Sequence, residues 1–216
     1  MSLPILISVP DSLCPAPRRT QTERRESTRR ALLDATIASL VECGYARTTT
    51  TEVTKRAGVS QGALFKHFPT KSALVSAAAE QLFADLFVEF GEAFAHASTQ
   101  DAPLVVAIHK LWDVFCRPEL LAVYRLYAEA PMDPELLACL VPVVKQHQEN
   151  IRACACELFP DLASSELARA LFGAVVYAMQ GLSMQRSVHV DPAEEALVLE
   201  KIEELARLLL AGGKPT

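Results

Sequence analysis

The sequence lacks the patterns by which most enzymes, exported proteins and membrane proteins are recognised. It has no Gly-rich phosphate loop, nucleophile elbow or paired-histidine metal motif, so we expect no catalytic site, no cofactor and no metal. No basic residue precedes the apolar run over residues 3–9, as a secretory signal would require. The uncharged run between Arg169 and Arg186 has 16 residues, fewer than the roughly 20 that cross a bilayer. A soluble, non-enzymatic protein is expected.

Cysteine spacing gives no disulfide framework. The six cysteines lie at positions 14, 43, 116, 139, 154 and 156, and two of them, Cys154 and Cys156, would point about 200° apart on a helix. Reduced thiols in a cytoplasmic protein are therefore expected.

Strand signals are also missing, because no alternating β-branched runs are bounded by turn residues. The thirteen prolines fall mostly at segment ends, so the sequence predicts an all-α protein of about nine helices. Pro142 would kink or break the seventh of these helices, and that boundary stays open. The predicted helices cover approximately residues 23–43, 49–57, 61–67, 71–96, 102–116, 119–129, 133–158, 164–186 and 192–211.

The segment over residues 48–71 predicts a helix-turn-helix. Thr49 and Glu52 have capping-box spacing, Gly58 is suited to the left-handed residue after a helix, and Ser60 is a second cap. Two short helices joined by a glycine-containing turn form the arrangement whose second helix enters the DNA major groove. We expect the shared core of this unit to contain Val53, Ala57, Val59, Leu64 and Phe68.

The second of these helices presents a set of side chains suited to reading DNA. Gln61 lies at its N-terminal end, where an amide of that length can bond an adenine edge twice. Gly62 and Ala63 would allow close approach to the bases, although on spacing alone they are equally small surface residues. The remaining residues predicted to face solvent or a partner are Phe65, Lys66 and His67.

Several short motifs resemble the signature of the TetR family of bacterial transcriptional regulators. They are Gly44-Tyr45, Thr48-Thr49, Ala57-Gly58-Val59-Ser60, Leu64-Phe65-Lys66-His67-Phe68 and Lys71-x-x-Leu74, within residues 29–78. The resemblance implies that residues 61–67 are the recognition helix. It also implies that Thr49, Thr51, His67 and Lys71 meet phosphates or nearby bases. Phe65, Thr50 and Thr54 depart from the usual family residues, which leaves the role of Phe65 open.

Charge is divided unevenly along the chain. Residues 1–75 hold eleven Lys and Arg against six Asp and Glu, whereas residues 76–216 hold ten against twenty. A basic head on an acidic body directs one end of a protein toward a polyanion. An arginine-rich arm leads into the first helix and is either a solvated charge run or a phosphate contact. It contains Arg18, Arg19, Arg24, Arg25, Arg29 and Arg30.

We predict three regions: a disordered extension over residues 1–22, a helix-turn-helix domain over 23–70, and a helical effector-binding and dimerisation domain over 71–216. The resemblance implies an effector pocket in the last region, for a lipophilic or aromatic small molecule. Candidate lining residues, for each of which plain core packing is the alternative, are Trp112, Phe115, Cys116, Tyr124, Tyr127, Met132, Phe172 and Tyr177.

The last two predicted helices carry apolar faces that suit a dimer interface. The segment over residues 171–184 is apolar nearly all round, which requires burial on several sides. An intramolecular core is the alternative, but the resemblance implies a four-helix bundle between two chains. The predicted interface residues are Phe172, Val175, Val176, Met179, Leu182, Val198, Ile202, Leu205 and Leu209.

Together these features predict a homodimeric, sequence-specific DNA-binding regulator, a ligand-responsive repressor that a small effector releases from an inverted-repeat operator. Two alternatives remain open from the sequence. A non-specific architectural DNA-binding protein would show basic charge beyond the head, and a helical enzyme with a helix-turn-helix-like head would need a catalytic constellation.

Overall fold

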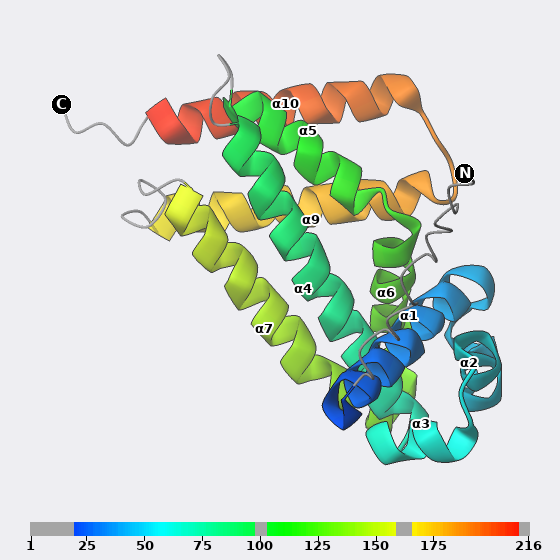
Figure 1. Cartoon of the computed structure of the whole chain (residues 1–216). Coiled ribbons are helices and arrows are strands. Elements are labelled where there is room, and N and C mark those ends of the chain that lie inside the picture. The colour runs from blue at the N-terminus through cyan, green and yellow to red at the C-terminus, as the bar shows by residue number, and fades with distance from the viewer. Residues whose placement is uncertain (1–19, 98–102, 159–165, 212–216) are drawn as a thin grey trace, which may run out of the picture.

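The computed structural model describes residues 20–97, 103–158 and 166–211, and within them it consists of helices without strands (Figure 1). The all-α prediction is confirmed. The elements are α1 (Gln21–Arg47), α2 (Thr50–Ala57), α3 (Gln61–His67), α4 (Lys71–Ala97), α5 (Pro103–Phe115), α6 (Pro118–Glu129), the 3-10 turn η1 (Ala130–Met132), α7 (Pro134–Leu158), α9 (Glu166–Arg186) and α10 (Pro192–Ala211).

Helix α1 begins earlier than predicted. Thr20 caps it, accepting a hydrogen bond from the Glu23 backbone N–H while the Glu23 carboxylate accepts one from the Thr20 N–H. This reciprocal pair satisfies two N–H groups that would otherwise lack partners. The predicted extension over residues 1–22 therefore ends before Thr20, and residues 1–19 lie outside the described part of the chain. At Gly44 the backbone leaves the helical region, with φ 75°, so the expected break is present and a final turn follows it.

A first core cluster holds the head of the molecule together. Val53 of α2, Leu64 of α3 and Phe68 pack with Leu32 and Leu33 of α1. All five side chains are buried. Ala57 and Val59 lie against the same cluster, so the predicted shared core is confirmed. The cluster fixes α3 on the outside of α1 and α2 (Figure 1).

Helix α4 belongs to both cores of the protein. Leu74 and Ala78, near its beginning, complete the core of the head, whereas Val75, Phe83 and Leu86 belong to a second, larger cluster in the body. One continuous helix therefore connects the core of the head to the core of the body.

A polar junction ties the head to the start of α7. The Tyr45 hydroxyl donates to Asp133 Oδ2 at 2.6 Å, and Lys71 Nζ donates to the Tyr45 carbonyl at 2.7 Å while lying 3.8 Å from the Tyr45 ring centroid. Asp133 Oδ1 accepts from the Leu136 N–H, and that bond lowers the pKa of Asp133. Burial raises the pKa of Tyr45 to about 12. The junction thus joins α1, α4 and α7.

Pro142 does not end α7, which continues from Pro134 to Leu158. A proline inside a helix removes one hydrogen bond and costs about 3 kcal/mol. Leu136 and Leu140 are buried in the body core on the same helix, so packing offsets the local cost and keeps the helix in one piece.

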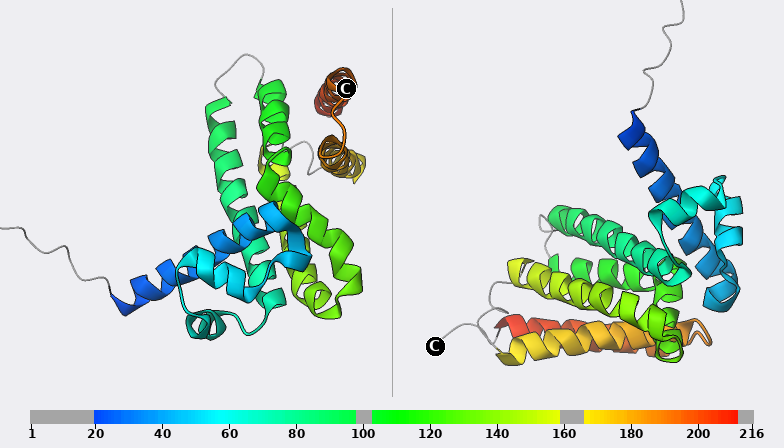
Figure 2. Two further views of the ribbon diagram at one scale, coloured as in Figure 1. Left: turned by 90° about the vertical axis from the view of Figure 1, so that its right-hand side faces the viewer. Right: turned by 90° about the horizontal axis from the view of Figure 1, so that it is seen from below.

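Helices α9 and α10 lie side by side as an outer layer of the body, away from α3 (Figure 2). Val175 and Met179 of α9 and Leu199 and Ile202 of α10 face the body core. The opposite faces of both helices remain at the surface of the single chain.

Candidate nucleic-acid interface and internal cavity

The turn between α2 and α3 is built by local capping. Thr49 Oγ1 accepts from the Glu52 N–H at 3.2 Å, and Ser60 Oγ accepts from the Ala63 N–H at 3.2 Å. Gly58 between them is left-handed, with φ 67° and ψ 31°, a conformation that disfavours residues with a Cβ atom. Only half of the predicted capping box forms, the bond from the Glu52 N–H to Thr49 Oγ1. The Glu52 carboxylate does not bond the Thr49 N–H and lies 3.4 Å from Arg56 Nη2 instead.

Gln61 is exposed at the first turn of α3 and is held by its neighbour across the turn. Its Nε2 donates to Thr51 Oγ1 at 2.7 Å, and Thr51 is also exposed. An amide fixed in this way keeps its other donor and its acceptor free for a base edge, the use predicted for Gln61. Thr51 therefore positions the Gln61 amide. The sequence did not indicate this role.

The other predicted reading residues of α3 lie at the surface of the chain. Gly62 and Lys66 are exposed, Ala63 is half-buried, and Phe65 is 49% exposed. With half of its surface exposed, Phe65 is not part of the protein core. The predicted reading residues therefore share one outward surface.

His67 and Lys71 are less open than the other predicted contacts. Burial, with Arg25 and Arg29 nearby, lowers the pKa of His67, so its ring is uncharged at neutral pH. Lys71 is half-buried and its ammonium already bonds Tyr45. Contact of either residue with a phosphate stays a prediction, and for Lys71 it requires release from, or sharing with, the Tyr45 carbonyl.

The arginine-rich arm separates into two groups. Arg30 pairs with Asp34 at 3.0 Å and with Asp85 at 2.7 Å, so it connects α1 to α4. The Arg29 guanidinium lies 5.7 Å from the Phe68 ring centroid, while Arg24 and Arg25 are exposed. These last two remain candidates for phosphate contact; Arg18 and Arg19 lie outside the described residues.

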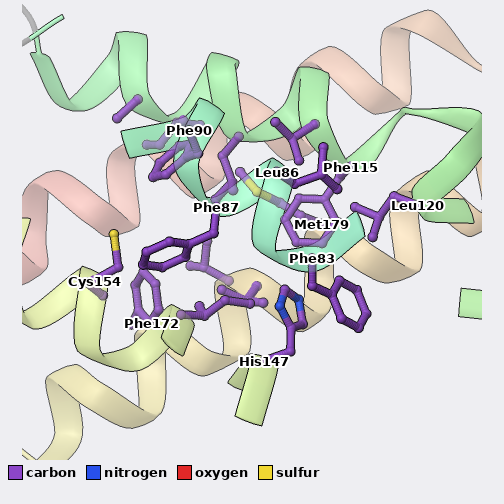
Figure 3. A pocket seen from close by; sticks show the side chains of 18 of the residues that line it. Phe83, Leu86, Phe87, Phe90, Phe115, Leu120, His147, Cys154, Phe172 and Met179 are labelled. Atoms are coloured by element: carbon purple, nitrogen blue, oxygen red, sulfur yellow. The ribbon is translucent and has the colours of Figure 1, made fainter. Parts of the chain in front are cut away.

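An apolar cavity of about 150 Å³ lies within the body (Figure 3). Its walls come mainly from α4, α5, α7 and α9, with smaller contributions from α6 and α10. The aromatic lining is dense, and its members are Phe83, Phe87, Phe90, Phe115, Tyr124, His147 and Phe172. The cavity contains no Asp, Glu, Lys or Arg among the described residues that line it.

Three of the eight predicted pocket residues line this cavity: Phe115, Tyr124 and Phe172. The other five do not. Met132 is 87% exposed and Tyr177 56% exposed, because the faces on which they lie point away from the body. Trp112 is buried and donates from Nε1 to Glu195 Oε1 at 3.1 Å. Cys116 and Tyr127 pack against the core cluster outside the cavity lining.

The sequence contained an unused signal for this cavity. Phe83, Phe87 and Phe90 recur on α4 at spacings of four and three residues, which places them on one helix face. His147 of α7 stacks on Phe83 with ring centroids 3.7 Å apart and planes 8° from parallel. Burial lowers the pKa of His147 to about 4, so the imidazole is neutral at pH 7.

The predicted dimer face turns inward. Val175, Met179 and Ile202 are buried within the single chain, Val176 and Phe172 line the cavity, and the described remainder packs on the body core. These residues therefore contribute to the core and cavity of the single chain, because α9 turns this side toward α4, α5 and α7. Their contact with a second chain stays a prediction. The predicted residues in that remainder are Leu182, Val198 and Leu205; the Leu209 side chain is outside the described part.

The opposite side of α9 is apolar and open. The exposed residues on this side follow helical periodicity and include several small side chains: Leu167, Ala170, Ala174, Tyr177, Ala178, Gly181 and Met184. On α10, Leu197 and Leu208 are 54% and 70% exposed. A contiguous apolar face of this kind on a folded chain marks an interaction surface.

Searches for other chemistry in the described residues give two further findings. No group of His, Cys, Asp and Glu there could hold a metal ion. Among those same residues, none of the helices is long and apolar enough to cross a membrane.

Comparison with known proteins identifies related sequences. Residues 32–78 match the family model described as bacterial regulatory proteins, tetR family. An uncharacterized HTH-type transcriptional regulator of Mycobacterium tuberculosis is 32% identical over 199 residues, covering 90% of this chain and 98% of the relative. The regulator CymR of Pseudomonas putida is 32% identical over 119 residues, covering 55% of this chain and 59% of CymR.

Solved structures share the fold. A candidate TetR-family transcriptional regulator of Mesorhizobium loti superposes with a TM-score of 0.68 at 20% identity, over 87% of this chain and 97% of that one. The multidrug binding protein EbrR, in complex with imidazole, gives a TM-score of 0.60 at 24% identity, over 82% and 93%. Because residues 32–78 match the tetR family model and the M. tuberculosis relative aligns over nearly its whole length, this chain belongs to the TetR family of bacterial transcriptional regulators, DNA-binding proteins that are not enzymes.

Proposed function

We propose that the protein is a homodimeric repressor that binds an inverted-repeat operator and leaves it when a small molecule enters the cavity of the body. The observation that carries the proposal is the course of α4. Its first residues pack in the core of the head beside α3, and its Phe83, Phe87 and Phe90 line the cavity. One rigid element thus connects the two sites.

The proposed DNA contact uses α3 in the major groove. Gln61, held by Thr51 at 2.7 Å, reads an adenine edge, and Gly62 and Ala63 permit close approach of the helix backbone. Thr49, Lys66, His67 and Lys71 surround these groups with donors for phosphate oxygens. Phe65, with half of its surface exposed, supplies apolar contact to a thymine methyl or a sugar.

The proposed dimer brings together the outward faces of α9 and α10 from two chains. Small residues at Ala174, Ala178 and Gly181 are exposed and allow close helix packing. Leu197 and Leu208 extend the apolar surface onto α10. With one α3 in each chain, such a dimer meets two half-sites related by a two-fold axis, which corresponds to an inverted repeat.

Release follows from the position of the cavity between α4 and α7. These helices meet at the Phe83–His147 stack inside the body and are joined at the Tyr45–Asp133–Lys71 junction under the head. A ligand that separates them inside the body shifts the start of α4 and hence α3. A ligand that binds this shifted form better weakens DNA binding by the same coupling free energy, typically ~1–3 kcal/mol.

Related structures support a small-molecule partner. EbrR has been solved with imidazole and with ethidium, which shows that a protein of this fold accepts such molecules. For the present chain, we propose that the apolar cavity holds the small molecule.

A direct test selects bound fragments from random DNA with the full-length protein. We expect an inverted repeat whose half-sites lie one or two helical turns apart. The selected duplex is then challenged with metabolite extracts, and an extract that dissociates the complex is fractionated. Recovery of fragments without a common sequence would contradict the operator proposal and favour architectural binding.

A further inference from the structure

The size of the cavity limits what can occupy it. At about 150 Å³, it is similar in volume to apolar cavities that accept a molecule such as benzene. Drug-sized ligands usually occupy pockets of roughly 300–1,000 Å³. A single ring with a short substituent therefore fits the cavity without rearranging the helices around it.

The charge of the lining limits the ligand further. Among the described residues, the ionisable members of the lining are Tyr124, His147 and Cys154. Burial raises the pKa of Tyr124 and of Cys154, which keeps both protonated and uncharged. His147, with a pKa of about 4, is also uncharged at neutral pH. A charged ligand would lose its hydration and gain no counter-charge, which is strongly unfavourable.

One lining group is placed to bind a polar atom. One face of the His147 ring is covered by the stack on Phe83, and neither ring nitrogen has a hydrogen-bond partner among the described residues. Figure 3 shows this ring at the cavity beside Phe83. A neutral imidazole offers one donor and one acceptor, enough for one hydroxyl or carbonyl group of a ligand.

From these three features we infer that the cavity takes an uncharged, single-ring aromatic molecule carrying at most one hydrogen-bonding group, and that this group bonds His147. The inference rests on the proposed function for its regulatory meaning, but the binding itself is tested separately. The inference excludes large aromatic cations and free carboxylates as ligands of the cavity.

The test uses four one-ring probes of nearly equal size: toluene, benzyl alcohol, benzoate and benzylammonium. Calorimetric titration of the full-length protein at pH 7.5 should show binding of toluene and benzyl alcohol. The two ions should bind at least a hundredfold more weakly. Equal affinity for either ion, or no binding of any of the four probes, overturns the inference.

The polar contact is tested with two isosteric variants. His147→Phe keeps the stack on Phe83. It should lower the affinity for benzyl alcohol about fivefold, the equivalent of one ordinary hydrogen bond. The affinity for toluene should change less than twofold. Tyr124→Phe serves as the comparison, because the Tyr124 hydroxyl is another polar group of the lining, and it has no hydrogen-bond partner among the described residues. A loss confined to Tyr124→Phe overturns the assignment to His147.

The location is tested by filling the cavity. Val176→Trp places a large ring in the space and should abolish binding of both neutral probes. Val88→Trp, on the exposed surface of α4, is the matched control and should bind normally. If Val176→Trp fails to fold by circular dichroism, Ala107→Leu at the cavity wall replaces it; full binding by a folded filled variant overturns the site.

Operator release is then measured by fluorescence anisotropy with the same probes. Neutral probes that bind but leave the operator complex intact support the inference on ligand class and contradict the release mechanism of the proposed function. Neutral probes that bind and release DNA support both. The inferred ligand class and the proposed release mechanism are therefore tested separately.

Discussion

Gln61, the residue predicted to read a base, is exposed at the first turn of α3. Its amide is exposed and held 2.7 Å from Thr51 Oγ1, so little side-chain freedom is lost when it meets a base. We predict that Gln61→Ala weakens binding to the selected operator by about 1–3 kcal/mol and relaxes the preference at one base pair. Affinity for every variant of the operator, measured by anisotropy, gives the result.

Lys71→Ala is the comparison for that experiment. A phosphate contact predicts equal weakening on all sequences and a salt slope smaller by about 1. An unchanged slope would assign Lys71 only to the Tyr45 junction, where its ammonium lies now. Gln61→Ala that weakens all sequences equally would remove Gln61 from base reading.

His147 makes the stability of the protein depend on pH. Burial lowers its pKa from 6.5 to about 4, so the unfolded chain binds a proton more readily than the folded chain between these values. Stability is therefore complete above about pH 6.5 and decreases as the pH falls toward 4. Allowing for partial exposure, we predict a loss of about 1–2 kcal/mol between pH 7 and pH 5.

Urea unfolding at both pH values measures this loss. In His147→Phe the contribution should disappear, whereas exposed His189→Ala should keep it. A variant at position 147 with the same pH dependence as the wild type would assign the loss to another group.

At the scale of elements, the α2–α3 turn depends on one backbone conformation. Gly58 has φ 67°, where a Cβ atom costs about 1–2 kcal/mol. We predict that Gly58→Ala lowers the free energy of unfolding by about that amount and misplaces α3. Chemical denaturation measures the stability and anisotropy measures the DNA affinity.

Gly62→Ala is the matched control for that substitution. Gly62 lies inside α3, and an added Cβ would meet only Ser60 Oγ at 4.0 Å. Stability should be equal or higher because alanine favours helices, while DNA affinity falls if the bases approach as closely as proposed. If Gly62→Ala destabilised the protein as much as Gly58→Ala, the left-handed turn would not be the cause.

For the whole molecule, α9 decides how two chains meet. Ala178 is exposed at the middle of the open apolar face, so we predict that Ala178→Arg converts the dimer to a folded monomer and lowers operator affinity at least tenfold. Analytical ultracentrifugation and circular dichroism measure both states. Ala84→Arg, on the exposed side of α4, should remain dimeric; a dimeric Ala178→Arg would rule out this face.

The junction between head and body provides the other test at this scale. Tyr45→Phe removes the 2.6 Å bond to Asp133 and leaves the ring under Lys71. We predict that ligand affinity is unchanged while the ligand-induced loss of DNA affinity shrinks severalfold. Full ligand-induced release in the variant would show that α4 transmits the change without the junction.

The sequence by itself determined the helix-turn-helix, the helical fold and the family. The caps at Thr49 and Ser60 and the turn at Gly58 are local signals, in which each residue acts on backbone groups two or three positions away. Proline placement located the starts of α5, α6, α7 and α10 for the same reason. Pro142 was the exception, because burial of its helix outweighs the local preference.

Only the tertiary structure decided which sides of the body helices face inward. Because α9 is apolar nearly all round, its periodicity could not distinguish Met179, which is buried, from Ala178, which is exposed. The cavity likewise depends on residues far apart in the chain, such as Phe83 and His147. Local patterns determine where helices begin and end, whereas the choice of buried face and the space left between helices depend on how all of them pack together.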